Sequence, residues 1–264
     1  MRPVERAAVV THGATRNVDE AVARLRAVAE GTGVELLDRE SAEKPDLAVA
    51  LGGDGTMLRA LARFLATGVP VIGANFGRVG FLTAIAGEQL ESGMVRVFSG
   101  EYDVVALPTL EVEVGGGRYV AVNDAVIVSG TPGRIVGIQY LLDGEDLGTQ
   151  PCDGLLCATP PGSTAYNLSN GGPVLVWGLE AAVLTFVAPH TLHARPLVVG
   201  PGFRLEVVNR SPDVEAVVLA DGHQVASLGT GESVTVRFGE SRTMLATLPE
   251  QTFFRRYAQV FGID

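Results

Sequence analysis

Lysine is almost absent from this 264-residue chain, because Lys44 is the only lysine among its 20 basic residues. This scarcity nearly excludes mechanisms that depend on a lysine, such as a Schiff base or the lysine of a P-loop. The two cysteines, Cys152 and Cys157, are too few for a disulfide framework, and buried thiols are the ordinary interpretation. The first residues lack a secretory apolar segment, and runs such as 181–187 are too short to span a membrane.

Positive charge is also scarce, since 30 acidic residues outnumber the 20 basic ones and leave a formal net charge of −10. This balance argues against nucleic acid or an anionic membrane as partners, although a local basic pocket for phosphate stays open. Charged residues make up 19% of the chain and apolar ones 47%, which suffices for one large core or two smaller ones. We therefore expect a soluble cytoplasmic protein that binds neither nucleic acid nor membrane.

The first hundred residues alternate between short apolar runs and helical patterns. The run LAVAL at 47–51 is apolar throughout, as in a strand that is buried on both faces. Apolar residues recur with helical spacing from Val18 to Ala29, and glycines follow. The alternation predicts an α/β domain with a parallel sheet, with strands over 7–10, 34–37, 47–51 and 69–73 and helices over 18–29 and 56–66.

After about residue 100, short alternating runs follow one another, separated by Gly, Pro, Asp and Asn. This pattern is typical of an all-β domain of the sandwich kind. A last segment, 249–261, has the pattern of a helix. We expect an α/β domain over 1–101, a β-rich domain over 102–246 and a C-terminal segment over 247–264. The strands expected in the β-rich domain are 110–114, 119–122, 125–129, 138–142, 155–159, 182–187, 204–208, 216–219, 224–228 and 233–238.

The segment Gly52-Gly53-Asp54-Gly55-Thr56 directly follows the LAVAL run. Open α/β sheets bind ligands at the carboxyl ends of their strands, where glycines let backbone N–H groups approach an anion. A carboxylate in such a loop repels phosphate unless it has a task. Asp54 could take a proton from an attacking hydroxyl or help to hold a metal. The alternative is that Asp54 caps the following helix.

Two further segments carry polar groups of the same kind. Asn75-Phe76-Gly77-Arg78-Val79-Gly80-Phe81-Leu82 follows the next strand, and its arginine is a candidate phosphate partner, or else a solvated loop residue. The pair Asn123-Asp124 lies between two β-rich runs. An Asn amide suits an adenine edge or a ribose hydroxyl, and an Asp accepts from ribose hydroxyls, although the pair alone could be a turn.

The most informative stretch is 153–169, DGLLCATPPGSTAYNLS, in which a strand ends in a Pro-Gly turn rich in hydroxyls. Ser163 and Thr164 can bond a base or a phosphate, and Tyr166 offers an aromatic face with a hydroxyl at its tip. The spacing of His190 and His193 invites a metal, but no Cys, His or carboxylate cluster accompanies them, so we expect no metal ligands. The segment 221–224, DGHQ, fits either a hairpin turn or a site.

These motifs, in this order from about residue 47 to 224, resemble the NAD kinase family. The loop at 52–55 resembles the GGDG motif that NAD kinases share with lipid kinases and 6-phosphofructokinases. The stretch 153–169 resembles DGLxxxTPxGSTAYxxS, which the lipid kinases lack. Segments 189–197 and 221–224 are similar to the family's Pro-His-Thr…Arg-Pro-Leu and Asp-Gly-Gln motifs. Val79, Pro161 and His223 depart from the usual residues, and Pro161 removes a hydroxyl.

The resemblance implies a Rossmann-like α/β domain, a β-sandwich domain, a C-terminal helix that packs back on the first domain, and a site between the domains. It implies phosphoryl transfer from ATP to the adenosine ribose 2′-hydroxyl of NAD, giving NADP, with Mg²⁺ carried by the donor. Asp54 would be the general base, and Gly52, Gly53, Gly55 and Thr56 would hold the donor phosphates. The residues expected to bind NAD are Phe76, Arg78, Asn123, Asp124, Asp153, Ser163, Thr164, Ala165, Tyr166, Ser169 and Asp221.

The family resemblance also implies a homodimer or homotetramer, in which Asp153 could act across a subunit interface. Two other functions stay open, namely another GGDG-type small-molecule kinase and a dinucleotide sensor that does not catalyse. The sequence after Asp153 argues against the first, and the intact Asp54 argues against the second. The donor, ATP or polyphosphate, and the acceptor, NAD or NADH, stay open as well.

Overall fold

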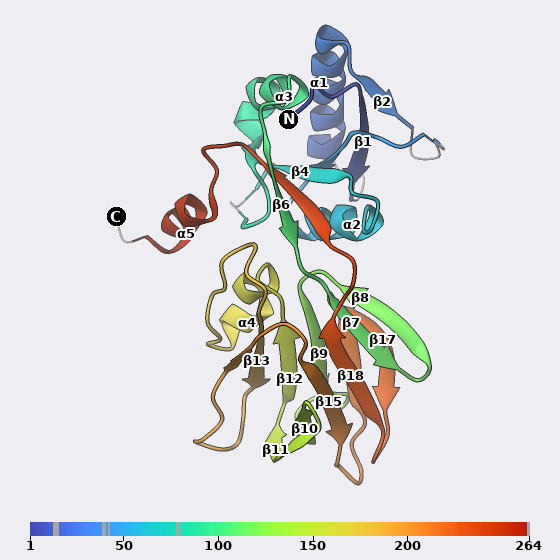
Figure 1. Ribbon diagram of the computed structural model, residues 1–264, viewed down its shortest axis with the longest axis vertical. Helices are drawn as coiled ribbons and strands as arrows, with labels where there is room; N and C mark the ends of the chain where they lie inside the picture. Colours follow the sequence, from blue (N-terminus) through green and yellow to red (C-terminus); the bar gives the residue numbers. More distant parts are fainter. Residues whose placement is uncertain (13–15, 39–40, 42, 78–79, 263–264) are drawn as a thin grey trace. The chain divides into compact units, whose positions relative to one another are not determined.

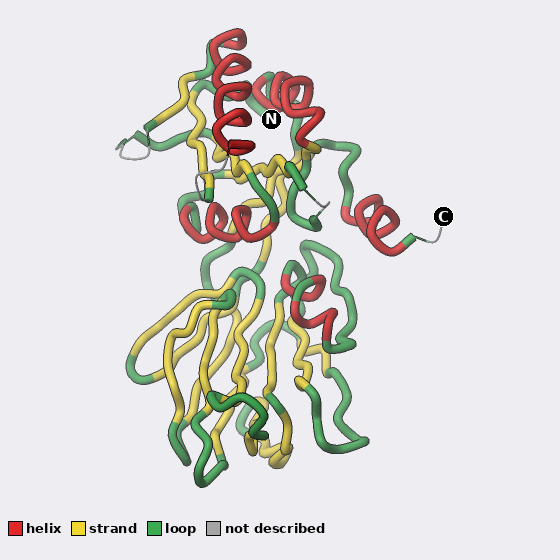
Figure 2. Tube along the Cα trace, turned by 180° about the vertical axis from the view of Figure 1, so that it is seen from behind, coloured by secondary structure: helices red, strands yellow, loops and turns green. Residues whose placement is uncertain are grey.

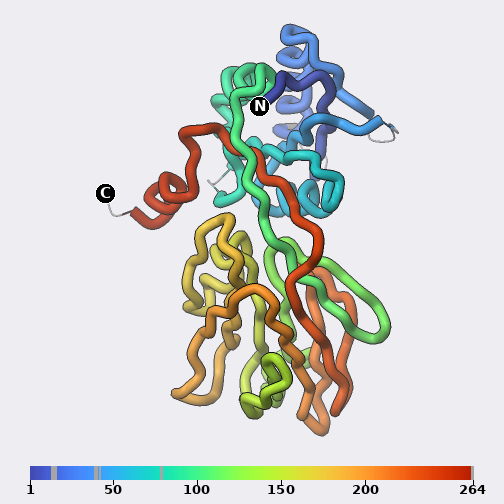
Figure 3. The backbone as a smooth tube through the Cα atoms, in the orientation of Figure 1, coloured from blue at the N-terminus to red at the C-terminus, as the bar shows by residue number. Residues whose placement is uncertain are grey.

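The chain forms two compact units in this computed structural model, which describes residues 1–12, 16–38, 41, 43–77 and 80–262. Unit 1 consists of Met1–Leu107 together with Arg242–Asp264, and unit 2 consists of Pro108–Ser241. The chain therefore leaves unit 1 once and returns to it near its end, as the colours along the tube in Figure 3 show.

Unit 1 is built on a seven-stranded sheet with the order β2-β1-β3-β4-β19-β6, to which β5 adds beside β4. All of its strand pairs are parallel except that of β19 with β6. The β3 run is buried at all five positions, as expected for a central strand covered on both faces. The strands are β1 (Arg6–Thr11), β2 (Glu35–Leu37), β3 (Leu47–Leu51), β4 (Pro70–Asn75), β5 (Ile85–Ala86), β6 (Asp103–Leu107) and β19 (Thr243–Thr247).

The helices of unit 1 cover both faces of this sheet (Figures 1 and 2). Helices α1 and α3 share one apolar cluster with the sheet, in which Leu25 and Met94 pack with Ile72. Helix α2 turns Met57 and Leu61 inward, and both are fully buried. The sequence-based expectation of a Rossmann-like α/β domain is confirmed. The helices are α1 (Arg16–Thr32), α2 (Asp54–Arg63), α3 (Leu90–Phe98), α5 (Phe253–Phe261) and the 3₁₀ turn η1 (Gly87–Gln89).

Unit 2 consists of two six-stranded antiparallel sheets with the orders β11-β10-β15-β18-β7-β8 and β14-β13-β12-β9-β16-β17. Inward side chains of both sheets form one apolar cluster, which contains Leu110, Ile138, Leu155 and Val218. This arrangement confirms the expected all-β sandwich. The elements are β7 (Leu110–Val114), β8 (Gly117–Ala121), β9 (Asp124–Ser129), β10 (Val136–Leu142), β11 (Glu145–Cys152), β12 (Gly154–Ala158), η2 (Gly162–Thr164), α4 (Tyr166–Ser169), β13 (Ala182–Val187), β14 (Leu197–Val199), β15 (Arg204–Asn209), β16 (Ala216–Ala220), β17 (His223–Leu228) and β18 (Ser233–Phe238).

The unit limits differ from the limits expected from the sequence. The first unit extends to Leu107 and resumes at Arg242, because β6 and β19 pair with each other in its sheet. The pattern analysis did not predict either strand. Helix α5 belongs to unit 1 by the same division, and the hydroxyl oxygen of Thr252 caps it by accepting the backbone N–H of Arg255 at 3.2 Å.

Candidate functional site

The glycine loop lies at the carboxyl end of β3, where its sheet would present a ligand site. Gly52 has a φ of +152°, and a Cβ there would lie 2.3 Å from the hydroxyl oxygen of Thr56, so this position requires glycine. Gly53 and Gly55 differ, because an added Cβ would meet no described atom within 4 Å. Packing within the described chain does not explain these two glycines. Their missing side chains leave the backbone N–H groups of Gly53 and Gly55 open to a ligand, whereas those of Gly52 and Thr56 donate to the carbonyls of Ala74 and Gly53, each at 2.9 Å.

Asp54 joins the two glycine segments of unit 1. Its carboxylate oxygens accept the backbone N–H of Phe81 at 2.8 Å and that of Leu82 at 3.1 Å. A Cβ on Gly80 would lie 2.2 Å from Oδ1 of Asp54, so the second segment passes close to this carboxylate only because it has a glycine there. The capping alternative for Asp54 is wrong, since Gly53 is the N-cap residue of α2 and no side chain caps it.

Helix α5 contacts the second glycine segment through the side chain of Arg256. The side chain of Arg256 is 2% exposed, and its Nη1 donates to the carbonyl oxygens of Gly80 and Thr83. Burial lowers the pKa of Arg256 to about 10, while the negative charge of Asp54 works in the opposite direction. The ring of Phe81 lies 6.2 Å from that of Phe253 and 5.5 Å from that of Phe261, measured between centroids. The amphipathic pattern of α5 was the one sequence signal that could have pointed to Arg256.

Two expected nucleotide contacts belong to this segment. Phe76 is half-buried, and its ring packs so closely on Gly87 that a Cβ there would lie 2.5 Å from it. Arg78 lies outside the described residues. A cavity of about 510 Å³ borders the segment, and Asn75 and Gly77 line it together with Arg255, Arg256 and Gln259 of α5.

In unit 2, the carboxylate of Asp221 holds the Asn123-Asp124 turn. It accepts the backbone N–H groups of Val122 at 2.8 Å, Asn123 at 2.7 Å and Asp124 at 3.3 Å. Asp221 adopts the left-handed backbone region, with a φ of +47°, and its own N–H donates to the carbonyl of Asp124 at 3.0 Å. The carboxylate of Asp221 thus stabilises the conformation of this turn.

The side chains of the turn are buried polar groups. Asn123 is 8% exposed, and its Oδ1 has no hydrogen-bond partner among the described residues. Asp124 is 6% exposed, and burial, aided by the charge of Asp221, raises the pKa of its carboxyl to about 7. A buried acceptor without a partner costs free energy, and a ligand that donates a hydrogen bond would remove that cost.

The stretch after β12 packs directly on this turn. The hydroxyl of Thr159 donates to the carbonyl of Val122 at 2.6 Å, and a Cβ on Gly162 would lie only 2.0 Å from the carbonyl oxygen of Asn123. Ser163 is fully buried, where its hydroxyl donates to Pro160 and accepts the N–H of Leu175. We therefore assign Ser163 to the support of this stretch and not to direct ligand contact.

The other expected NAD contacts on this stretch are more accessible. Thr164 and Ala165 are partly exposed, while Tyr166 is 41% exposed and Ser169 is exposed. The Thr164 hydroxyl donates to the carbonyl of Pro161 at 2.9 Å. The structure therefore brings Asn123, Asp124, Asp221 and the 159–166 stretch together in unit 2.

Asp153 is not part of this group. It precedes β12, whereas Thr159 follows it, so about 16 Å of extended strand separates the two ends. The side chain of Asp153 is exposed, and its backbone N–H donates to the carbonyl of Val187 at 3.0 Å.

The histidines do not form a metal site in the described part of the chain, where no group of three or more His, Cys, Asp and Glu side chains is placed to hold an ion. His190 and His193 are exposed. The Nδ1 of His223 lies 3.0 Å from the carbonyl oxygen of Asp221, next to the Asn123-Asp124 turn.

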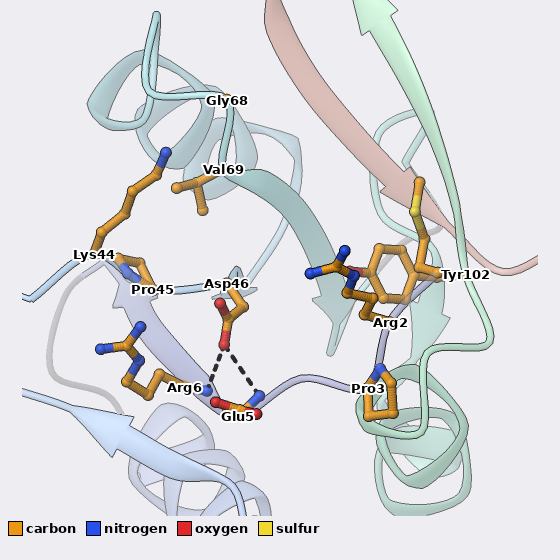
Figure 4. Close-up of a pocket in the computed structure, with 11 residues that line it drawn as sticks. Arg2, Pro3, Glu5, Arg6, Lys44, Pro45, Asp46, Gly68, Val69 and Tyr102 are labelled. Carbon is orange, nitrogen blue, oxygen red and sulfur yellow. Dashed lines mark hydrogen bonds between the residues drawn. The ribbon is translucent and has the colours of Figure 1, made fainter.

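A second cavity in unit 1, of about 800 Å³, lies at the other end of its sheet (Figure 4). It is bordered by residues that precede β1, β3 and β4, so it faces the amino ends of these strands. The carboxylate of Asp46 accepts the N–H groups of Glu5 at 3.1 Å and Arg6 at 2.9 Å. The side chain of Arg6 pairs with Glu43 at 2.9 Å. The charges of Asp46 and Arg6 are thus paired within the chain. We therefore do not assign this cavity to the candidate site.

None of the described helices has the length and apolar character needed to cross a bilayer.

Protein-family models match the chain in two parts. The model of the ATP-NAD kinase N-terminal domain matches residues 9–102, and that of the ATP-NAD kinase C-terminal domain matches residues 122–248. The NAD kinase of Gemmatimonas aurantiaca is 37% identical over 225 residues, which cover 82% of this chain and 77% of the relative. The NAD kinase of Azotobacter vinelandii is 37% identical over 238 residues, which cover 86% and 79%.

Solved structures agree in fold. The crystal structure of an NAD kinase from Archaeoglobus fulgidus in complex with ATP superposes with a TM-score of 0.80 at 29% identity, over 98% of this chain and all of the other. The yeast NADH kinase complexed with NADH has the same TM-score of 0.80 at 21% identity, over 98% and 88% of the two chains, and supports the fold alone.

Proposed function

This chain belongs to the NAD kinase family, and we propose that it transfers the terminal phosphoryl group of ATP to the adenosine ribose 2′-hydroxyl of NAD, giving NADP and ADP. It is a phosphotransferase with an alcohol acceptor, and it acts through nucleotide-dependent phosphoryl transfer. The ATP complex of the Archaeoglobus relative supports ATP as the donor, in preference to polyphosphate.

The observation that carries the dinucleotide assignment is the buried Asn123-Asp124 turn. The Oδ1 of Asn123, which has no partner among the residues that the structure describes, fits a donor such as an adenine amino group or a ribose hydroxyl. Asp124 supplies a second acceptor beside it, and Asp221 fixes the turn by accepting the backbone N–H groups of Val122, Asn123 and Asp124. Thr164, Ala165, Tyr166 and Ser169 extend the proposed NAD surface, with the exposed ring of Tyr166 available for stacking. We propose Phe76 and Arg78 as further contacts.

Asp54 is the proposed general base. Its carboxylate stands at the start of α2, within the loop whose open N–H groups at Gly53 and Gly55 would hold the donor phosphates together with Gly52 and Thr56. The N–H groups of Phe81 and Leu82 orient both of its oxygens. A carboxylate has lone pairs to spare after accepting two such bonds, so it can still accept the proton of the 2′-hydroxyl.

We propose that Mg²⁺ enters with ATP. This hard cation prefers oxygen ligands and is held in many phosphoryl-transfer sites by phosphates and one or two carboxylates. The loop fits that chemistry, because the carboxylate of Asp54 would offer the ion an oxygen ligand, while the open N–H groups of Gly53 and Gly55 would hold the phosphate oxygens that supply others. When bound, the ion would offset the charge that develops on the donor phosphates.

We also propose that the protein acts in the cytoplasm as a homodimer or homotetramer. Asp153 and the 159–166 stretch lie at opposite ends of β12, so a second copy is the better source of an Asp153 contact to the same dinucleotide. Light scattering at assay concentration tests the assembly, and a monomer that retains full activity would contradict it.

The test of the function uses the pure protein with NAD or NADH, Mg²⁺, and either ATP or polyphosphate. We expect NADP to form from NAD and ATP, and to depend on the metal. A protein that binds NAD but forms no NADP with either donor would instead be the dinucleotide sensor left open by the sequence. A protein that consumes ATP with another acceptor and ignores NAD would be a different small-molecule kinase.

A further inference from the structure

A histidine and an arginine meet beside the glycine loop. Strand β1 pairs with β3 so that Thr11 lies opposite Leu51, the last residue of β3. His12 therefore follows β1 at the same sheet edge at which Gly52 follows β3. The Nη1 of Arg59 lies 2.6 Å from the Nδ1 of His12.

Arg59 reaches this edge from α2. The helix begins at Asp54, so Arg59 lies five residues along it, about 7.5 Å from the loop along the helix axis. Side chains of an α-helix lean toward its N-terminus, which directs a long arginine back over the first turn. The contact with His12 is consistent with that direction.

The contact between Arg59 and His12 determines which nitrogen of the imidazole accepts the hydrogen bond. A guanidinium has only donors, so Nδ1 of His12 must accept, and the imidazole hydrogen then lies on Nε2. One N–H of Arg59 is used in this way, and four remain. Both residues are exposed at this edge, so the remaining donors face solvent.

The charge of the loop creates a need for such a cation. Asp54 and the donor phosphates are all negative, and they repel each other unless positive groups lie close by. Arg256 is 2% exposed and donates to the carbonyls of Gly80 and Thr83, so it is committed to the fold. Arg59 is exposed on the helix that starts in the loop.

We propose that Arg59, oriented by His12, binds the β- and γ-phosphates of the donor nucleotide; this rests on the proposed kinase function. Planar guanidinium groups form paired hydrogen bonds to phosphate oxygens, which suits a site without lysine. His12 is a positioning residue, because it acts through the arginine.

Steady-state kinetics on Arg59→Ala test the proposal. We expect the KM for MgATP to rise roughly tenfold or more, as for a lost charge-assisted hydrogen bond, while the KM for NAD stays within about twofold. The matched control is Arg63→Ala, one turn further along α2, where the guanidinium lies 5.2 Å from the centre of the Phe64 ring. This control removes the same charge and should leave both KM values unchanged.

Direct binding separates the phosphate contact from effects on turnover. Calorimetry with AMP, ADP and a non-hydrolysable ATP analogue should show that Arg59→Ala weakens ADP and the analogue but not AMP. His12→Asn places an amide oxygen where Nδ1 accepts, so it should retain more affinity for the analogue than His12→Ala.

Equal losses for all three nucleotides, or a KM for ATP that does not change in a folded Arg59→Ala variant, would overturn the proposal and leave the kinase function intact. Failure of the kinase function is a different result, since wild-type protein would then form no NADP.

Discussion

Asp54 has a structural task and a proposed chemical task on the same two oxygens. In Asp54→Asn, one oxygen is replaced by an NH₂ group that faces the N–H of Phe81 or Leu82, so one accepted hydrogen bond is lost. We expect the free energy of unfolding to fall by about 1–2 kcal/mol. The kcat should fall about 10²–10⁴-fold, because the base is lost. The measurements are kcat, NAD affinity and melting temperature on one preparation.

The two effects of Asp54→Asn can be separated by temperature. At 15–20 °C below its melting temperature the variant is folded, and a loss of kcat there belongs to the chemistry. A folded variant with nearly wild-type kcat would remove Asp54 from the role of base.

Asp124→Asn should weaken NAD binding and raise the stability of the folded protein above neutral pH. Burial raises the pKa of Asp124 from 3.8 to about 7, so between these pH values the folded protein holds a proton there that the unfolded chain has released. The stability that this proton provides is complete below pH 3.8 and is lost as the pH rises through 7, by a few kcal/mol at most. An Asn has no such loss. The variant should therefore exceed the wild type in melting temperature most at pH 8, by less at pH 5, and by little near pH 4.

The functional half of this prediction concerns NAD. Without the carboxylate, NAD affinity should fall roughly tenfold or more at pH 8, as calorimetry can show. An Asp124→Asn protein that binds NAD normally would place the dinucleotide elsewhere.

Sequence analysis identified candidate site residues whose side-chain chemistry suggests a role without knowledge of the fold, such as Asp54 and the Asn123-Asp124 pair. It did not find the work of Asp221, which bonds backbone N–H groups about a hundred residues away in sequence. The roles of Thr159 and Arg256 also escaped it, because both donate to carbonyls that only the tertiary fold brings near. Every residue type has the same backbone N–H and carbonyl groups (proline lacks the N–H). A sequence pattern therefore cannot indicate which of them a side chain will bond.

At the scale of elements, the close approach of η2 to the Asn123-Asp124 turn gives a sharp test. In Gly162→Ala the new methyl would lie 2.0 Å from the carbonyl oxygen of Asn123, so the turn has to shift. We expect the KM for NAD to rise at least tenfold, while the KM for ATP changes less. Gly200→Ala is the matched control, because its methyl meets no described atom within 4 Å and its φ is not positive. Equal kinetics in the two variants would separate this turn from NAD binding.

Elements with a regular apolar pattern were predicted with their observed limits, as β3, β7, β13 and β18 show. Helix α3 was missed because Gly93 interrupts its apolar pattern; a Cβ at this position would lie 3.0 Å from the side chain of Ile85, a tight contact. Strand β11 was missed because it is mostly exposed and polar. Strands β6 and β19 were missed because their partners in the sheet are distant in sequence, which also displaced the expected unit limits.

At the scale of the whole molecule, the two units should differ in their ability to fold alone. Unit 2 is one continuous segment that contains both of its sheets complete. A fragment of residues 108–241 should therefore melt cooperatively. A fragment of residues 1–107 lacks β19, which lies between β4 and β6, so it should stay largely unfolded. Circular dichroism and proton–nitrogen spectra compare the fragments, and a well-dispersed spectrum of 1–107 would contradict this expectation.

The late return of the chain to unit 1 has a consequence for synthesis on the ribosome. Strand β19 and helix α5, which complete the sheet and support the loop beside Asp54, emerge only after all of unit 2. At about 5–20 residues per second, unit 2 alone takes on the order of 10 s to be made, and it can fold during that time. Until then the sheet of unit 1 lacks β19, and the edges of β4 and β6 that pair with it stay exposed. A chain that ends before residue 242 would thus contain a complete sandwich but a sheet without β19 and a loop without the support of α5.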